Sequence, residues 1–524
     1  MGVERVSGGR AGRYAYATVL VLIVLLGAVL RTYDLSGVPG ELIVDEIDLY
    51  NSAHSIVTTG HDIDGTLLPF LYSPFTRNPP MYAVAGYFST LVFGKTAFGW
   101  RFPAVVFGLA AIVLIYLITL ELTKRRSIAL VAAFLQATAP IFIHFSRIGW
   151  EPAAELPFLL AGLYCLLRGS SLQSLAPAAT LLGLACYTYM AGWFYAIVLA
   201  GAALALNVQN FRSRRSCLNV ACAALIWLAV SLPALCMLFL DPSTAGKTAR
   251  IATFSYGVTL ESLRIFAVNY AAHFRWSYLV TTGDPIPAIT WRYLDGFGAF
   301  FWWVIPLAFV GAAFGYRYLR ERWMFIWLWL WLAVYPLGGA LTNEGAPNAP
   351  RTLAGAPVFC IFAAIGVALL FDFAASLRSP RLASSAKQAL RAAFSIAACV
   401  SVALFCRFYF VRYVHVDSNA WDSGTRAMFA AIRSRASGYQ RVCFSVRPAW
   451  YGIDAYDRFY LGDVPLVKID TIDSPACSLP ATLLVTDSDR HVVRADFMPI
   501  ASIRDVDGNP FAVVLARPLR QALR

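Results

Sequence analysis

Eleven apolar stretches of 16 to 24 residues follow one another along this chain and dominate its sequence. A helix that crosses a bilayer needs about 20 mostly apolar residues. Composition agrees with this pattern, because 59% of the 524 residues are hydrophobic and only 14% are charged, whereas a soluble globular chain carries about 25% charged residues. The sequence therefore predicts a mainly α, polytopic membrane protein and excludes a soluble enzyme or a disordered chain. The stretches lie at 14–31, 101–123, 127–145, 152–168, 175–190, 193–209, 217–240, 297–316, 323–341, 353–373 and 391–411.

The basic residues indicate how these stretches are oriented. Short clusters lie at 124–126, 212–215, 317–322 and 378–391, between apolar stretches, and three arginines precede the first one. Because cytoplasmic loops carry an excess of Lys and Arg, we expect these clusters and the N-terminus to be cytoplasmic. The net charge of +13 then reflects membrane topology, and we predict no nucleic-acid partner. We place the protein in a bacterial inner membrane as a multi-pass protein.

A twelfth apolar segment, 79–94, tests this topology. If it crossed the membrane, every later basic cluster would move to the outer side, against the orientation rule. We therefore predict that 79–94 is an interfacial helix within a long first external loop, residues 32–100. This topology also places most of the acidic residues on the outer side, so we expect carboxylate chemistry to be periplasmic or extracellular.

After the last apolar stretch the sequence becomes polar. Residues 412–524 combine a helix-like segment at 423–436 with strand-like runs at 441–446, 482–486 and 511–516. We predict two domains, a transmembrane domain at 1–411 and a small external α/β domain at 412–524. Cys443 and Cys477 are the only cysteines of the second domain, and we predict that they form a disulfide in an oxidising compartment.

An acidic pair opens the first external loop. Asp45 and Glu46 follow the first apolar stretch by about a dozen residues, which keeps both carboxylates near the membrane surface. A carboxylate shielded from water is a better proton acceptor. Acidic residues in the first turn of a helix also stabilise that helix. The pattern is typical of both roles, and the two are compatible.

Four further motifs follow in order. They are Asn78-Pro79-Pro80 leading to Phe93-Gly94, then Arg101-Phe102-Pro103, then Arg147 followed by Glu151-Pro152. Together with Asp45-Glu46 this order resembles the GT-C glycosyltransferases related to protein O-mannosyltransferases and to the lipid A aminoarabinose transferase. The resemblance covers roughly 14–170 and extends weakly to Pro350-Arg351-Thr352-Leu353.

The resemblance implies a GT-C bundle that transfers a sugar from a polyprenyl-phosphate carrier to an acceptor hydroxyl or phosphate on the outer face, with inversion. By position, Asp45 matches the family's first-loop catalytic acid, Glu151 matches a second acid that is usually Asp, and Glu46 completes the catalytic set. We expect donor-phosphate contacts from Arg77, Asn78, Arg275 and Arg351, because cations stabilise a leaving phosphate. Asn78 stands where the aminoarabinose transferase often has Lys, so Arg77 is our first choice for that contact.

Two other functions remain open from sequence. One is an oligosaccharide transferase or ligase that uses a polyprenyl-diphosphate donor, and the other is a lipid-linked sugar transporter or flippase. The scarcity of acids within the apolar stretches argues against a transporter. The expected partners are the polyprenyl-phosphate sugar, the lipid bilayer and a glycolipid, glycan or protein acceptor. No cofactor is identified, and a divalent metal is compatible with the chemistry although no ligand set for it is recognisable.

Overall fold

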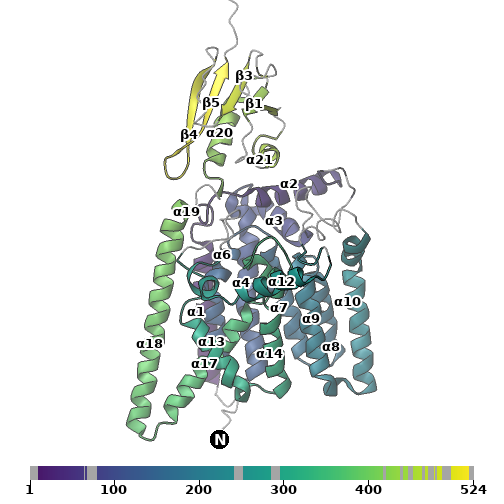
Figure 1. The fold of residues 1–524 in the computed structure, drawn as a ribbon, viewed down its shortest axis with the longest axis vertical. Helices are drawn as coiled ribbons and strands as arrows, with labels where there is room; N and C mark the ends of the chain where they lie inside the picture. Colours follow the sequence, from purple (N-terminus) through teal and green to yellow (C-terminus); the bar gives the residue numbers. More distant parts are fainter. Residues whose placement is uncertain are drawn as a thin grey trace, which may run out of the picture.

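The computed structural model consists of a helical bundle that carries a small sheet domain at one end (Figure 1). The first described helix, α1, starts at the opposite end of the bundle from the sheet. The structure describes residues 10–63, 65, 67, 79–240, 252–255, 257–284, 296–416, 421–436, 439, 441–445, 452–462, 466–469, 477, 481–486 and 497–517.

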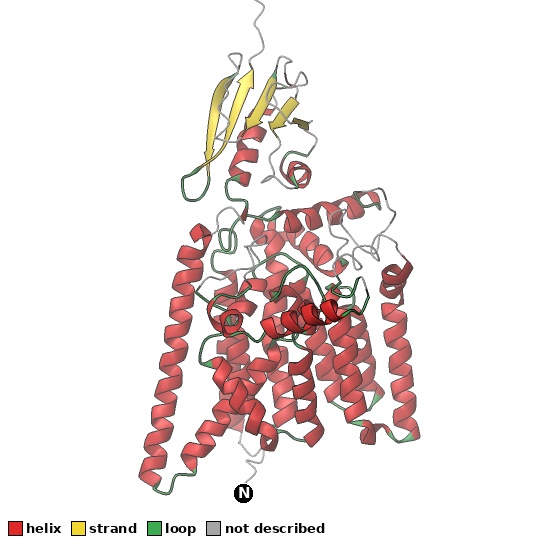
Figure 2. Ribbon diagram, viewed as in Figure 1, coloured by secondary structure: helices red, strands yellow, loops and turns green. Residues whose placement is uncertain are grey.

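The bundle is formed by helices that follow the predicted apolar stretches (Figure 2). Their bounds are α1 Arg10–Thr32, α4 Ala97–Thr123, α5 Arg126–Thr138, α6 Pro140–Phe145, α7 Pro152–Leu167, α8 Leu172–Ala185, α9 Met190–Leu206, α10 Arg214–Leu240, α13 Val304–Phe314, α14 Arg322–Val334, α15 Leu337–Ala340, α17 Pro357–Ala375 and α18 Pro380–Arg407. Among the described residues, six helical segments are long and apolar enough to cross a membrane, and six more apolar helices are shorter. The protein is therefore a helical membrane protein with several apolar spans.

Three predicted stretches differ in detail from the helices. The stretch 127–145 is two helices, because Pro140 starts α6 directly after Ala139 ends α5. The stretch 297–316 becomes helical only at Val304. The last helix, α18, begins at Pro380, eleven residues before the predicted start at 391. Its first turns contain basic residues that lowered the apolar signal, although Ser379 caps the helix by accepting a hydrogen bond from the Leu382 N–H.

Close helix packing in the bundle depends on glycine where α13 meets α17. A Cβ atom on Gly311 would lie 1.9 Å from the Phe362 carbonyl oxygen, and one on Gly366 would lie 2.1 Å from the Leu307 oxygen. Small residues allow membrane helices to approach closely and gain van der Waals contact. Elsewhere α4 packs between α5 and α7, and α8 packs between α7 and α10.

The basic clusters gather at the end of the bundle that holds the N-terminus. Arg320 pairs with Glu121 at 2.5 Å, and Arg125 lies 3.9 Å from Asp372. These contacts join the connections after α4, before α14 and after α17, as the predicted topology requires. Which side of a membrane this end faces stays a prediction.

Two helices of the first loop lie across the other end, next to the sheet domain (Figure 1). They are α2, Val44–Thr59, and α3, Pro80–Phe93. Both ends of α3 pack against the first turns of α4: the Tyr82 hydroxyl donates to the Trp100 carbonyl oxygen at 2.9 Å, and the Phe93 ring lies 4.7 Å from the Phe102 ring. The helix α3 therefore lies over the end of α4 and does not run along the bundle, as predicted for an interfacial helix. A further helix, α12 (Leu260–Ala272), belongs to the connection before α13.

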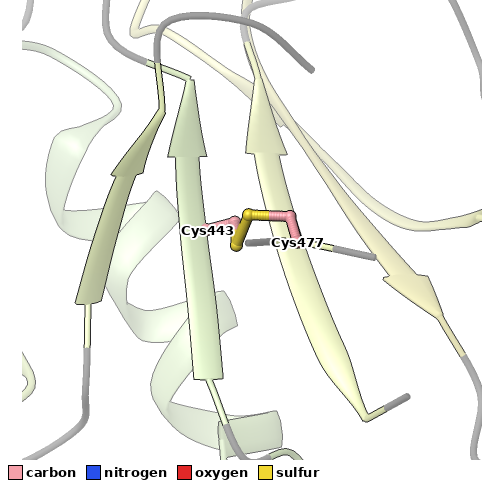
Figure 3. The surroundings of a disulfide bond; sticks show 2 residues. All are labelled: Cys443 and Cys477. Atoms are coloured by element: carbon pink, nitrogen blue, oxygen red, sulfur yellow. A yellow bond between two sulfur atoms is a disulfide. The ribbon is translucent and has the colours of Figure 1, made fainter. Parts of the chain in front are cut away.

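The C-terminal segment forms the predicted α/β domain. Its elements are α20 Thr425–Ala436, β1 Arg441–Ser445, α21 Ile453–Tyr460, β2 Leu466–Ile469, β3 Thr482–Thr486, β4 Met498–Arg504 and β5 Pro510–Arg517. The strand order is β2-β1-β3-β5-β4, with β1 parallel to β2 and β3, and β5 antiparallel to β3 and β4. The predicted disulfide between Cys443 and Cys477 is confirmed, and it links β1 to a segment beside the sheet (Figure 3). The sequence prediction missed β2, β4 and α21.

Candidate active site

A buried ion pair between Glu46 and Arg101 organises the start of α2. The guanidinium Nε and Nη2 atoms of Arg101 donate to Glu46 Oε1 and Oε2, both at 2.8 Å, and both side chains are fully buried. Arg101 also donates to the carbonyl oxygens of Gly40 and Glu41 at 2.8 Å. Planar two-point pairing is the strongest geometry for this residue pair. The first turn of α2 is therefore held against α4.

The same carboxylate reaches the segment that follows α6. Glu46 Oε1 accepts a hydrogen bond from the Gly149 N–H at 2.7 Å, and the Trp100 indole N–H donates to the Gly149 carbonyl oxygen at 2.9 Å. Glycine is required here, since a Cβ atom would lie 2.3 Å from the Trp100 ring. Three motifs that are distant in sequence are thus joined through Glu46.

This arrangement brings the predicted acids to one region. Asp45 precedes Glu46 in the first turn of α2 and is half-buried, and Glu151 is the N-cap residue of α7, two residues after Gly149, and is buried. Glu46 itself also accepts from the Ile43 N–H at 3.2 Å, which is the helix-capping role expected for an acidic residue in the first turn. Both carboxyl oxygens of Glu46 are therefore engaged in structural hydrogen bonds.

Arg147, another motif residue, forms hydrogen bonds that stabilise the fold. Its guanidinium group is fully buried and donates to the carbonyl oxygens of Leu30 at 3.0 Å, Tyr33 at 2.7 Å and Val38 at 2.8 Å. The side chain therefore caps the end of α1 and shapes the first loop that leads to Asp45.

The C-terminal domain contributes a carboxylate that the sequence analysis did not select. Asp422 lies within electrostatic range of Asp45 and Glu41, and it accepts a hydrogen bond from the Tyr456 hydroxyl. Burial raises the pKa of Asp422 to about 7; the Tyr456 hydrogen bond opposes this rise, and the two neighbouring carboxylates add to it. Burial also raises the pKa of Glu41, against the hydrogen bonds it accepts from the Arg426 and Gly424 N–H groups at 2.8 and 3.3 Å. No pattern in the polar C-terminal sequence indicated this contact.

Several contacts hold the C-terminal domain over α2. Trp421 is buried against Gly40, where a Cβ atom would lie 2.4 Å from the tryptophan. The Asn51 side-chain amide donates to the Ala455 carbonyl oxygen at 2.7 Å. Lys95 donates to the Phe459 carbonyl oxygen, and partial burial lowers the pKa of its amine to about 8. The region around Asp45 is therefore covered by the second domain.

The structure describes two of the four predicted phosphate-binding residues, Arg275 and Arg351. Arg77 and Asn78 lie outside the described residues. Arg275, which follows α12, is exposed. Arg351, in the short helix α16 (Ala349–Thr352), pairs with Glu344, and its Nη1 atom is buried without a hydrogen-bond partner among the described residues. Arg351 is thus the described cation best placed to take a further ligand.

A buried acid in the first turn of α7 was also overlooked as a site residue. Glu155 lies one helical turn after Glu151, is fully buried, and neither of its carboxyl oxygens has a hydrogen-bond partner in the described structure. Its Oε1 atom lies next to Gly192 of α9. The i, i+4 spacing from Glu151 was the available signal, because such residues share one face of a helix.

Within the described ranges, no group of three or more His, Cys, Asp or Glu residues is arranged to hold a metal ion.

Comparison with solved structures identifies the class of fold. Over 97% of its length the chain matches 98% of ArnT from Cupriavidus metallidurans bound to undecaprenyl phosphate, with a TM-score of 0.54 and 13% sequence identity. It also matches the archaeal oligosaccharyltransferase AglB from Archaeoglobus fulgidus, with a TM-score of 0.53 and 14% identity. That match covers 87% of this chain but only 65% of AglB. The chain therefore has an ArnT-like fold.

Sequence comparison points to the same class. Residues 77–236 match the family model described as dolichyl-phosphate-mannose-protein mannosyltransferase. The resemblance predicted from the sequence is confirmed over this segment: residues 77–236 match that family, and the fold of the whole chain is like that of ArnT. No curated protein sequence matches the chain significantly.

Proposed function

We propose that this protein transfers a monosaccharide from a polyprenyl-phosphate carrier to an acceptor hydroxyl or phosphate at the outer face of a bacterial inner membrane. In this proposal eleven segments cross the membrane and the C-terminal domain is external. The family name and the undecaprenyl phosphate bound to ArnT support the donor class. The observation that carries the proposal is the linkage of Glu46 to Arg101 and to Gly149, which brings Asp45 and Glu151 to one region.

In the proposed reaction Asp45 is the general base. Asp45 takes the proton of the acceptor, whose oxygen forms a bond to the anomeric carbon of the sugar. The bond from that carbon to the phosphate oxygen breaks, polyprenyl phosphate leaves, and the configuration inverts. Arg351 stabilises the charge that develops on the leaving phosphate, since fixed cations are most effective in water-poor surroundings. Its partnerless buried Nη1 atom supports this assignment.

The two carboxylates beside Asp45 have different proposed roles. Glu46 positions the base, because its oxygens are engaged by Arg101 and by backbone N–H groups. Glu151 orients the acceptor or the base from the start of α7. General-base catalysis is typically worth 10²–10⁴-fold, so the role of Asp45 is large enough to be tested by substitution.

The donor class can be tested with membranes that contain the overproduced protein. The membranes are supplied with radiolabelled monosaccharides linked to undecaprenol through one phosphate or through a diphosphate, and label in lipid, glycan and protein fractions is compared with membranes lacking the protein. Transfer from the monophosphate donors that is lost in Asp45→Asn and retained in Glu261→Gln, a substitution of an exposed residue on α12, supports the proposal. Transfer only from the diphosphate donors would favour an oligosaccharide transferase or ligase.

A further inference from the structure

A hollow between α5 and α17 lies far from the candidate active site. It has a volume of about 440 Å³, with Val131, Ala364 and Phe371 among its apolar lining and Arg125, Ser127 and Asp372 at its polar end. Arg125 follows the end of α4, 24 residues after Arg101 at its start, which corresponds to about 36 Å along the helix. The hollow therefore opens at the end of the bundle where the basic clusters gather.

This hollow, called the groove below, has a cation and an anion at its polar end, Arg125 and Asp372. Arg125 Nη1 and Asp372 Oδ2 are 3.9 Å apart, and their side chains are 42% and 53% exposed. An exposed ion pair at such a distance contributes little to stability. Asp372 also accepts a hydrogen bond from the Tyr318 hydroxyl, and Arg125 lies over the Tyr318 ring. Both charged groups are thus held in place while they remain accessible.

Most neighbouring charges are engaged with one another. Lys124 pairs with Glu121 at 2.6 Å, and Arg320 pairs with Glu121 at 2.5 Å and with Glu321 at 2.7 Å. Arg317 lies over the Tyr318 ring, next to the pair, and is not part of the groove lining. The charged residues of the groove lining are therefore one cation, Arg125, and one anion, Asp372.

The body of the groove suits a hydrocarbon chain. Its wall on α17 runs from Ala364 to Asp372, eight residues or about 12 Å of helix. Ala364 and Ala368 have small side chains, so they leave space along this wall. Val131 lines the groove from the facing helix. A polar end that leads into an apolar channel at one end of a membrane bundle matches the division of a phospholipid into headgroup and acyl chain.

The geometry points to a phosphatidylethanolamine-type lipid site, in which Arg125 binds the headgroup phosphate, Asp372 binds the headgroup ammonium, and an acyl chain lies between α5 and α17. Basic pockets between membrane helices are known binding places for anionic headgroups. The carboxylate of Asp372 attracts the ammonium of a zwitterionic headgroup, whereas the uncharged glycerol of phosphatidylglycerol gives it no cation to bind, so the pair of charges favours the zwitterionic lipid. This site is separate from the proposed active site and does not depend on the proposed reaction.

The test uses the full chain reconstituted in nanodiscs that contain equal amounts of phosphatidylethanolamine and phosphatidylglycerol. Lipids that stay bound on release from the nanodisc are counted by native mass spectrometry. We expect a retained phosphatidylethanolamine in the wild type, and about three- to tenfold less retention in Arg125→Gln and in Asp372→Asn, as expected for loss of an exposed charge contact. Ala364→Phe should abolish retention by filling the channel while it leaves both charges intact.

Matched variants separate this site from general lipid binding. Lys124→Gln and Glu121→Gln alter an ion pair at the same end of the bundle but outside the groove, so they should retain the lipid as the wild type does. Equal retention of both lipids by the wild type, stronger retention of phosphatidylglycerol, or unchanged retention in Ala364→Phe would each overturn the proposal. Thermal unfolding of every variant identifies a substitution that acts by disrupting the fold.

Discussion

Arg101 and Glu46 form a fully buried, two-point ion pair that joins α4 to the first turn of α2. The same Glu46 carboxylate accepts a hydrogen bond from Gly149, so one side chain links the first loop, the start of α4 and the segment before α7. Within the Asp45-Glu46 pair, Glu46 therefore has a structural role, and Asp45 is the proposed base.

Asp45→Asn is expected to lower turnover by about 10²–10⁴-fold, because the amide keeps the shape of the side chain but does not accept the proton. Insertion, purification and melting temperature should stay close to the wild type. Glycosyl transfer in reconstituted vesicles measures the effect. Near-normal turnover in this variant would show that Asp45 only stabilises the helix, and Glu151 would become the leading candidate for the base.

Glu46→Gln is expected to lower stability. Removing one partner of a buried ion pair leaves an uncompensated charge, which costs about 3–5 kcal/mol. The double variant Glu46→Gln, Arg101→Met should recover part of this loss, since it removes both charges. Thermal unfolding in detergent measures both effects, and full stability of the Glu46→Gln protein would contradict the role we give to the pair.

The pKa of Asp422 provides a prediction on pH. Burial raises this pKa from 3.8 to about 7, so between about pH 4 and pH 7 the folded state keeps a proton that the unfolded state has released. Stability should therefore fall as the pH rises through this window, by at most about 1.4 kcal/mol per pH unit, and level off above it. Asp422→Asn should reduce this slope. An unchanged slope, with Glu261→Gln as the reference variant, would show that Asp422 does not titrate in this range.

The predicted orientation can be tested by labelling. In a variant without the eight free cysteines, single cysteines replace Thr58 on α2 or Lys124 after α4, both exposed. An impermeant thiol reagent added to intact spheroplasts should label the first and not the second, and inside-out vesicles should give the reverse. Labelling of both from one side would refute the topology, because it would place the two ends of α4 on the same face.

The apolar stretches and the C-terminal change in composition were sufficient to predict the helical membrane fold and the C-terminal sheet. These features depend on residues that are close in sequence. A helix that crosses a bilayer needs a long apolar stretch, and the hydrophobic periodicity of a short segment indicates a helix or a strand. The disulfide was predictable because only two cysteines occur in the C-terminal domain. Asp45 and Glu151 were selected because their motifs match, in order, those of the glycosyltransferases that the sequence resembles.

Which of the motif residues come into contact with one another depends on the tertiary structure. The sequence does not distinguish the structural role of Glu46 from the role proposed for Asp45, since the difference lies in contacts with Arg101 and Gly149, 55 and 103 residues away. It also gave no sign that Asp422 comes within electrostatic range of Asp45, because docking of the C-terminal domain depends on packing of Trp421 against Gly40 and on a hydrogen bond from α20 to Glu41. Local sequence patterns determine helices and strands. The residues that surround a buried charge are determined only by the packing of segments that are distant in sequence.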